Sequence, residues 1–160
     1  CGQRPYLPDP VAAAELIAKQ LAPLGFRIKV APTRDLDEYF QKTSTGDYDL
    51  MLSGWIPDTP NAFDFLDVLL SSKNIPGNEK TVMSSINLSR WKNDEMDRAL
   101  DAYRLDASSA RTTIASMLHR EAPVIALMYG ADILVHSPKV QNVSKGFSEL
   151  PLFSDLMLAV

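Results

Sequence analysis

The segment YDLMLSGWIPDTPNAFDFL, residues 48–66, decides the fold that the sequence predicts. Residues 48–53 are short and mostly apolar, which indicates a strand. Residues 54–60 contain one glycine and two prolines and form a stiff turn, because glycine widens and proline restricts the backbone conformations. A helix is expected over residues 61–70. The segment therefore predicts a strand, a loop and a helix, the repeating unit of an α/β domain.

The turn contains two candidate ligand contacts, Trp55 and Asp58. Both follow the carboxyl end of the expected strand, and ligands bind at that end in open α/β sheets. A purely structural interpretation is also open. The Trp55 ring would then cap a core, and Asp58 would stiffen the turn before Pro60.

Hydrophobic periodicity and capping residues predict the remaining elements. Helices are expected over residues 9–24, 33–42, from about 94 through 103 and over 108–121; strands over 26–30, 124–129 and 133–136; and a small last element over 151–160. Two strands joined by a helix of this length are most simply parallel. We therefore expect one α/β domain over residues 1–160, with a mostly parallel central sheet flanked by helices.

Composition excludes several classes of protein. The net charge of −4 and the scattered basic residues argue against a nucleic-acid surface in this domain. No apolar run reaches the ~18 residues of a membrane-spanning helix. Cys1 is the single cysteine, so no disulfide forms within the chain. Cys1 is either the lipid-bearing first residue of a mature lipoprotein or the first residue of a fragment, and we favour the fragment.

Chemical motifs are mostly absent. His119 lies near Glu121, but no second histidine stands at a metal-ligand spacing, so no metal is expected. No Gly-x-Ser-x-Gly turn and no glycine-rich phosphate loop occurs, so neither a catalytic residue nor a cofactor is expected. A triad assembled in space leaves a small hydrolase open as a hypothesis.

The central segment resembles that of the family 5 extracellular solute-binding proteins, the peptide- and nickel-type receptors of ABC importers. That family often shows a Tyr-Asp pair, an apolar strand, Gly-Trp, two variable residues, Asp and then Phe-Leu. The matching residues here are Tyr48-Asp49, Gly54-Trp55, Asp58 and Phe65-Leu66. The turn departs from the family, since residues 61–63 read Asn-Ala-Phe where the family often has Asp-Pro-Asp.

Further segments extend the resemblance over nearly the whole chain. They are the Arg-Pro-Tyr-x-Pro-x-Pro run at 4–10, the ordered set Asn87, Trp91, Asn93, Glu95 and Asp97, the Glu-x-Pro-x-Ile-x-Leu pattern at 121–127 and the Val-x-Asn-Val-x-x-Gly pattern at 140–146. The resemblance implies a lobe like those of type II periplasmic binding proteins, and specifically the C-terminal lobe of a two-lobe receptor.

The implied function is substrate binding for an ABC-type importer, without enzyme activity. A peptide or similar small solute would bind in the cleft between this lobe and an N-terminal lobe, and the receptor would deliver it to the membrane permease. The implied location is periplasmic or extracytoplasmic, with a lipid anchor as one alternative. A second hypothesis is the solute-sensing domain of a bacterial transcriptional regulator, which the residues before Cys1 would distinguish.

The resemblance also implies roles for individual residues. Asp58 would pair with the α-ammonium group of a peptide, and Trp55 would form an apolar wall. Gly54 and Ile56 would offer backbone groups to an extended ligand. Asn87 is a further candidate contact. The alternative for this segment is purely structural, with Asn93 and Asp94 as helix caps and Trp91 in the core.

Overall fold

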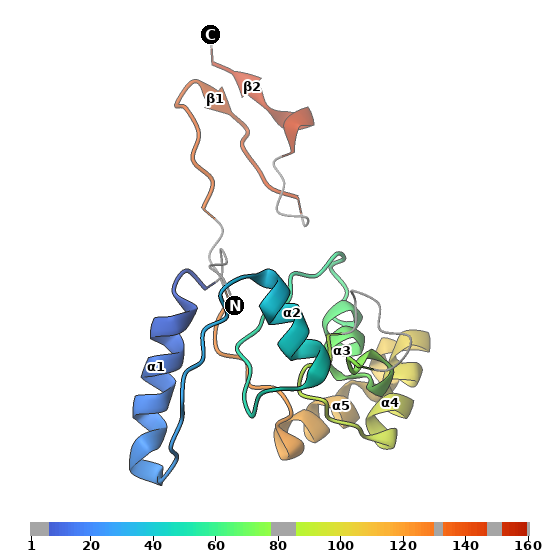
Figure 1. Ribbon diagram of the computed structural model, residues 1–160. Coiled ribbons are helices and arrows are strands. Elements are labelled where there is room, and N and C mark those ends of the chain that lie inside the picture. The colour runs from blue at the N-terminus through green and yellow to red at the C-terminus, as the bar shows by residue number, and fades with distance from the viewer. Residues whose placement is uncertain (1–6, 78–85, 130–132, 147–151, 160) are drawn as a thin grey trace.

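The computed structural model describes residues 7–77, 86–129, 133–146 and 152–159, and these residues form mainly helices (Figure 1). The α-helices are α1 (Pro10–Leu21), α2 (Leu36–Thr45), α3 (Phe63–Leu70), α4 (Asp94–Leu105) and α5 (Ala107–Glu121). Short 3₁₀ turns follow α1 at Ala22–Leu24 and α3 at Ser72–Asn74, and a third lies at Phe153–Asp155. The predicted helices are thus all present, with bounds that shift by a few residues.

Side-chain caps explain where the helices begin. The Asp9 carboxylate accepts a hydrogen bond from the Ala12 amide at 2.9 Å, as expected for the first helix. The Asn93 side chain likewise caps α4. The second helix begins later than predicted, because Asp35 rather than Thr33 is its cap and accepts from the Glu38 amide at 2.8 Å.

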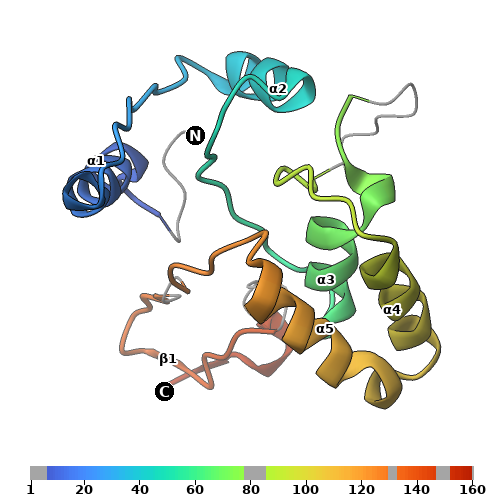
Figure 2. The same cartoon turned by 90° about the horizontal axis from the view of Figure 1, so that it is seen from below.

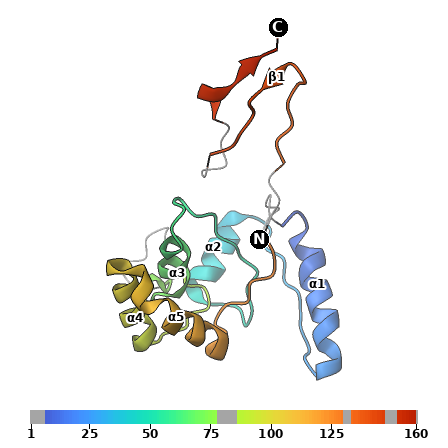
Figure 3. The ribbon, with the colours of Figure 1, turned by 180° about the vertical axis from the view of Figure 1, so that it is seen from behind.

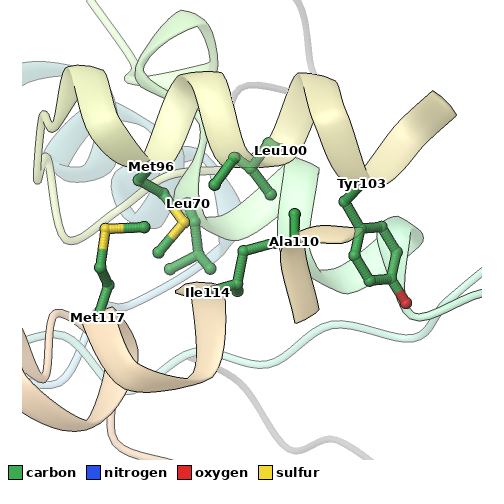
Figure 4. Close-up of a cluster of buried hydrophobic side chains, with 8 residues drawn as sticks. Leu70, Met96, Leu100, Tyr103, Ala110, Ile114 and Met117 are labelled. Carbon is green, nitrogen blue, oxygen red and sulfur yellow. The ribbon is translucent and has the colours of Figure 1, made fainter. Parts of the chain in front are cut away.

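The core lies where α3, α4 and α5 meet (Figure 4). A single residue, Asp106, separates α4 from α5, so the two helices form a tight hairpin. The stacked rings of Phe63 and Tyr103, with centroids 6.3 Å apart, attach the first turn of α3 to α4. The buried apolar residues of this core are Leu70, Met96, Ala99, Leu100, Tyr103, Ala110, Ile114 and Met117. We call α3, α4 and α5 together the helical unit.

The expected parallel central sheet is not seen in the described part of the chain. The strands there are β1 (Val140–Gln141) and β2 (Met157–Leu158), which pair antiparallel with Val140 opposite Leu158. Residues 26–30, 48–53, 124–129 and 133–136, which were predicted as strands, contain none. The connection expected at Gly130-Ala131 lies outside the described residues.

The predicted segments form no strands because they lack a pairing neighbour among the described residues. A strand satisfies its backbone N–H and C=O groups through an adjacent strand, so an apolar segment without such a neighbour has no ladder to join. In residues 124–129 the side chains also lack a covering layer: Ile125 is 73% exposed and Tyr129 is 91% exposed. The apolar pattern of these segments is that of buried strands, but the side chains of 124–129 are exposed and those of Tyr48, Met51 and Leu52 are only half-buried.

The remaining elements are arranged around the helical unit. The chain just after α2 is tied to the chain before α4 by the Tyr48 hydroxyl, which donates to the Leu88 carbonyl at 2.7 Å. Helix α1 lies to one side of the helical unit (Figure 2). The hairpin of β1 and β2 stands clear of the helices in two opposite views (Figures 1 and 3).

Candidate ligand-binding loop

Residues 54–59, which we call the ligand loop, connect residues 48–53 to the chain that enters α3. At its start, the Ser53 hydroxyl lies 3.0 Å from the hydroxyl of Tyr39, a buried residue of α2. At its end, the Asp64 carboxylate in the first turn of α3 accepts from two loop amides. The ligand loop is therefore attached to a helix at both ends.

The contact at the end of the loop involves consecutive residues. One oxygen of Asp64, Oδ2, accepts from the backbone N–H groups of Asp58 and Thr59, the latter at 2.9 Å. The Asn61 side chain accepts from the Phe63 amide at 3.0 Å and organises the step into the helix. Hydrogen bonds to a charged acceptor are stronger than neutral ones, so Asp64 restrains this end of the loop.

The side chains of the loop differ in exposure. Trp55 is half-buried, and its indole Nε1 is buried without a hydrogen-bond partner among the described residues. Ile56 is 44% exposed. Asp58 is exposed, and no hydrogen bond or ion pair of its carboxylate is found in the described chain.

This combination defines the chemistry that the loop can perform. A free carboxylate attracts a cation or a group with several N–H donors. Half-buried aromatic and aliphatic surface favours an apolar part of the same ligand. The four predicted loop residues, Gly54, Trp55, Ile56 and Asp58, thus lie together and fit an amine-bearing ligand with an apolar portion.

Asn87 occupies a different environment, since its side chain is fully buried. Its amide Nδ2 donates to the carbonyls of Leu70, Ser71 and Trp91 at 3.3, 3.1 and 3.0 Å. Its Oδ1 accepts from the Ser89 hydroxyl at 2.8 Å. These bonds join the end of α3 to the chain before α4.

The structure does not bring Asn87 next to the ligand loop. The loop precedes the first residue of α3, whereas Asn87 bonds to the last residues of that helix. Eight residues of α-helix span about 12 Å at 1.5 Å per residue, so the two lie at opposite ends of α3. A ligand contact of Asn87 stays a prediction, and it would need some of its internal hydrogen bonds to open.

A separate open cavity of ≈ 290 Å³ lies on α4 and α5. Its lining is Glu95, Thr112, Thr113, Ser116, Met117 and Arg120, none of which was predicted as a site residue. Among the described residues, no group of three or more His, Cys, Asp or Glu side chains could hold a metal ion. None of the helices described is long and apolar enough to cross a membrane.

The groups with shifted pKa values lie at helix caps and ends. The Arg34 backbone N–H and guanidinium, with a further contribution from Lys42, lower the pKa of the Glu38 carboxyl. The Ser108 hydroxyl and amide lower the pKa of Asp106, the cap of α5. The Glu121 carboxylate raises the pKa of the Arg120 guanidinium. These contacts stabilise helices rather than mark a reaction centre.

The sequence interpretation missed the residues that hold the loop in place. Asp64 was assigned only to the expected helix, and the contact between Tyr39 and Ser53 spans 14 positions. A signal for Asp64 was present, because an acid in the first turn of a helix can accept from free backbone N–H groups. No sequence signal pairs Tyr39 with Ser53.

Comparison with known proteins adds the family. Residues 4–77 match the family model described as bacterial extracellular solute-binding proteins, family 5 Middle. This range includes the whole ligand loop. The chain is related to the family 5 extracellular solute-binding proteins. The resemblance noted in the sequence is thereby confirmed.

Curated relatives of this chain have names that describe peptide transport or binding. It is 33% identical over 144 residues to the Peptide transport periplasmic protein SapA of Haemophilus influenzae, covering 86% of this chain and 24% of the relative. It is 29% identical to Di/tripeptide-binding protein 1 of Pseudomonas aeruginosa strain UCBPP-PA14, covering 88% and 25%. It is also 29% identical to the Dipeptide-binding protein of P. aeruginosa strain PAO1, covering 89% and 25%.

The chain therefore spans about a quarter of the length of these relatives. Their names are those of transport and binding proteins rather than enzymes, and the alternative of a regulator's sensing domain finds no support in them. No solved structure matches the chain.

Proposed function

We propose that this chain is the C-terminal lobe of a two-lobe receptor that binds a peptide or similar small solute for an ABC importer. The observation that supports this most directly is the family 5 match over residues 4–77, because it includes the ligand loop. The names of the curated relatives point to the same class of ligand. The receptor would work in the periplasm or outside the membrane and deliver its solute to a membrane permease.

An N-terminal lobe is the partner that this proposal requires. Closure of two lobes over a solute excludes water, so a few polar contacts hold the solute strongly. The exposed apolar residues of segments 26–30 and 124–129, among them Phe26, Ile125 and Tyr129, support a partner that covers them. We propose that these segments become strands of a central, mostly parallel sheet when the rest of the protein supplies their neighbours.

The ligand loop is the proposed contact surface of this lobe. The Asp58 carboxylate pairs with the α-ammonium group of the peptide through charge-assisted hydrogen bonds. Trp55 supplies an apolar wall, and Gly54 and Ile56 offer backbone groups to an extended ligand. For Asn87 we propose support of the chain around α3, with direct ligand contact left as the alternative.

Calorimetry on the complete protein that contains this chain tests the role of Asp58. Short peptides should bind more tightly than their N-acetylated forms, because acetylation removes the positive charge. Asp58→Asn should weaken binding of the free peptide by about tenfold to a hundredfold, since hydrogen bonds to charged groups contribute about 1.5–3 kcal/mol. The N-acetylated peptide should lose much less.

Asp101→Asn is the matched control, because Asp101 is an exposed carboxylate on α4 and its partner is Arg104. This variant should bind both peptides as the unaltered protein does. Equal affinity for free and acetylated peptides would refute the role of Asp58. A complete protein that binds no short peptide would refute the proposed ligand class.

A further inference from the structure

Asp64 is the side chain that joins the ligand loop to the helical unit. Its Oδ2 atom accepts from the amides of Asp58 and Thr59, two consecutive residues at the end of the loop. The carboxylate of Asp58 itself makes no hydrogen bond or ion pair within the described residues. Of these two neighbouring acids, one is therefore committed to the backbone and the other is free for a ligand.

Asp64 has a fixed position because its helix is packed. Leu70 of α3 is buried in the core, and Phe63, Leu66 and Leu69 pack against that core. A carboxylate in the first turn of such a helix holds the loop backbone at a set distance from the helical unit. The contact of Ser53 with Tyr39 restrains the other end of the loop in the same way.

Restraint at both ends has a consequence for binding. A loop that is ordered before the ligand arrives loses less conformational entropy on binding than a free loop does. The hydrogen bond from the Asp58 amide to Asp64 also restrains the Asp58 backbone, and this limits the directions that its carboxylate can take. Selectivity for a cationic group depends on that placement, since charge-assisted hydrogen bonds need good geometry.

We propose that Asp64 is a positioning residue that sets the preference of the ligand loop for a peptide with a free amino terminus. This inference rests on the proposed function and extends it. Asp64 acts through the Asp58 and Thr59 amides and does not touch the ligand. Its substitution therefore changes the discrimination between ligands as well as the stability of the loop.

The test compares trialanine with N-acetyl-trialanine by calorimetry on the complete protein, and the readout is the dissociation constant of N-acetyl-trialanine divided by that of trialanine. In Asp64→Ala this ratio should fall by about tenfold, the effect of losing one or two charge-assisted hydrogen bonds that place Asp58. A purely structural role would reduce the fraction of active protein and leave the ratio unchanged.

Two further variants separate positioning from charge. Asp64→Asn keeps an oxygen that accepts from the two amides, but through weaker neutral hydrogen bonds, so its ratio should fall less than that of Asp64→Ala. A ratio in Asp64→Asn as low as in Asp64→Ala would overturn positioning through the loop amides. Asp64→Glu keeps the charge on a longer side chain and should lower the ratio, which preserves the test if Asp64→Ala does not fold.

Asp67→Ala is the control on the same helix. The Asp67 carboxylate pairs with Lys73 at 2.9 Å, away from the loop, so its loss should not change the ratio. Asp58→Asn is measured in parallel. If Asp58→Asn lowers the ratio and Asp64→Ala does not, the positioning role is wrong and the proposed function stands. If Asp58→Asn leaves the ratio unchanged, the proposed role of Asp58 fails and the positioning role of Asp64 fails with it. A complete protein that binds neither peptide refutes the proposed ligand class.

Discussion

At the scale of single residues, a buried amide organises the part of the chain between α3 and α4. Asn87 has no exposed surface, and both ends of its side-chain amide are hydrogen-bonded. Its Nδ2 donates to three carbonyls, and the carbonyl of Ser71 also accepts from the Asn74 amide at 3.0 Å. A polar side chain is stable in such a place only because its partners are complete.

We predict that Asn87→Ala lowers the free energy of unfolding by about 3 kcal/mol, because the carbonyls of Leu70 and Trp91 lose this donor and the Ser89 hydroxyl loses its acceptor. Asn74→Ala is the comparison, since the Asn74 amide makes one such bond, to the Asp67 carbonyl at 2.8 Å. That variant should lose about 1 kcal/mol. Urea denaturation measures both, and equal losses would contradict the network role of Asn87.

Gly77 marks a close approach of two backbone segments. A Cβ atom at this position would lie 2.7 Å from the Ser44 carbonyl oxygen, and the residue has φ +94°. Gly25 has nearly the same φ, +90°, but nothing lies within 4 Å of its Cβ position. An alanine at Gly25 therefore introduces backbone strain alone, whereas an alanine at Gly77 adds a steric contact with Ser44.

Gly25→Ala should cost about 1 kcal/mol, the penalty of a left-handed conformation for a residue with a side chain. Gly77→Ala should cost about 1–3 kcal/mol more, because the Ser44 segment must move. Denaturation midpoints of the two variants check the difference. Indistinguishable losses would show that residues 44 and 77 do not approach as closely as described.

At the scale of elements, the hairpin of α4 and α5 depends on Asp106. Its carboxylate accepts from both the amide and the hydroxyl of Ser108, at 2.9 and 2.8 Å, and so begins α5 directly after α4 ends. The same bonds lower the pKa of Asp106, the hydroxyl contributing most. The capping interaction is therefore linked to pH.

A lowered pKa in the folded state means that the stabilisation is fully present above the ordinary aspartate pKa of about 3.9. It is lost as the pH falls through the lower, folded-state pKa. Asp106→Asn, a neutral cap, should therefore flatten the acid side of the stability curve below about pH 4. Urea midpoints measured from acid to neutral pH would show the change.

Ser108→Ala supplies the companion measurement. Without the hydroxyl, the folded-state pKa of Asp106 is depressed less, so less stability should be lost between neutral and acid pH. If the unfolding free energy falls with acid pH as steeply in both variants as in the unaltered protein, Asp106 does not contribute to the acid transition.

At the scale of the whole molecule, the chain combines a packed part with uncovered segments. The helical unit buries its apolar residues between three helices. Residues 124–129 begin two residues after α5, and their apolar side chains are exposed to solvent. Under the proposed function, residues outside this chain would cover this apolar pattern and complete the sheet.

Hydrogen exchange tests this division. In the 160-residue chain by itself, the amides of residues 96–103 should be protected and those of 124–129 should exchange rapidly. In the complete protein, residues 124–129 should gain protection as they pair with neighbouring strands, and residues 96–103 should change little. Rapid exchange of 124–129 in the complete protein would contradict the proposed sheet.

Local chemistry explains why the sequence by itself determined the helices. Asp9, Asn93 and Pro10 act on the first turn that follows them, and the apolar stripe of Met96, Leu100 and Tyr103 recurs at the helical period. The family could also be recognised, because the Gly-Trp-x-x-Asp pattern at 54–58 is contained in one short segment. Such features involve residues a few positions apart.

Tertiary structure alone decided the rest. The predicted parallel sheet depends on strand neighbours, and residues 26–30 and 48–53 have none in the described chain, so an apolar pattern was insufficient to make them strands. The attachment of the ligand loop through Tyr39, and the burial of Asn87 behind α3, result from contacts between distant segments. The physical reason is that capping and periodicity act within one helix, whereas pairing and burial require a partner that only the folded chain provides.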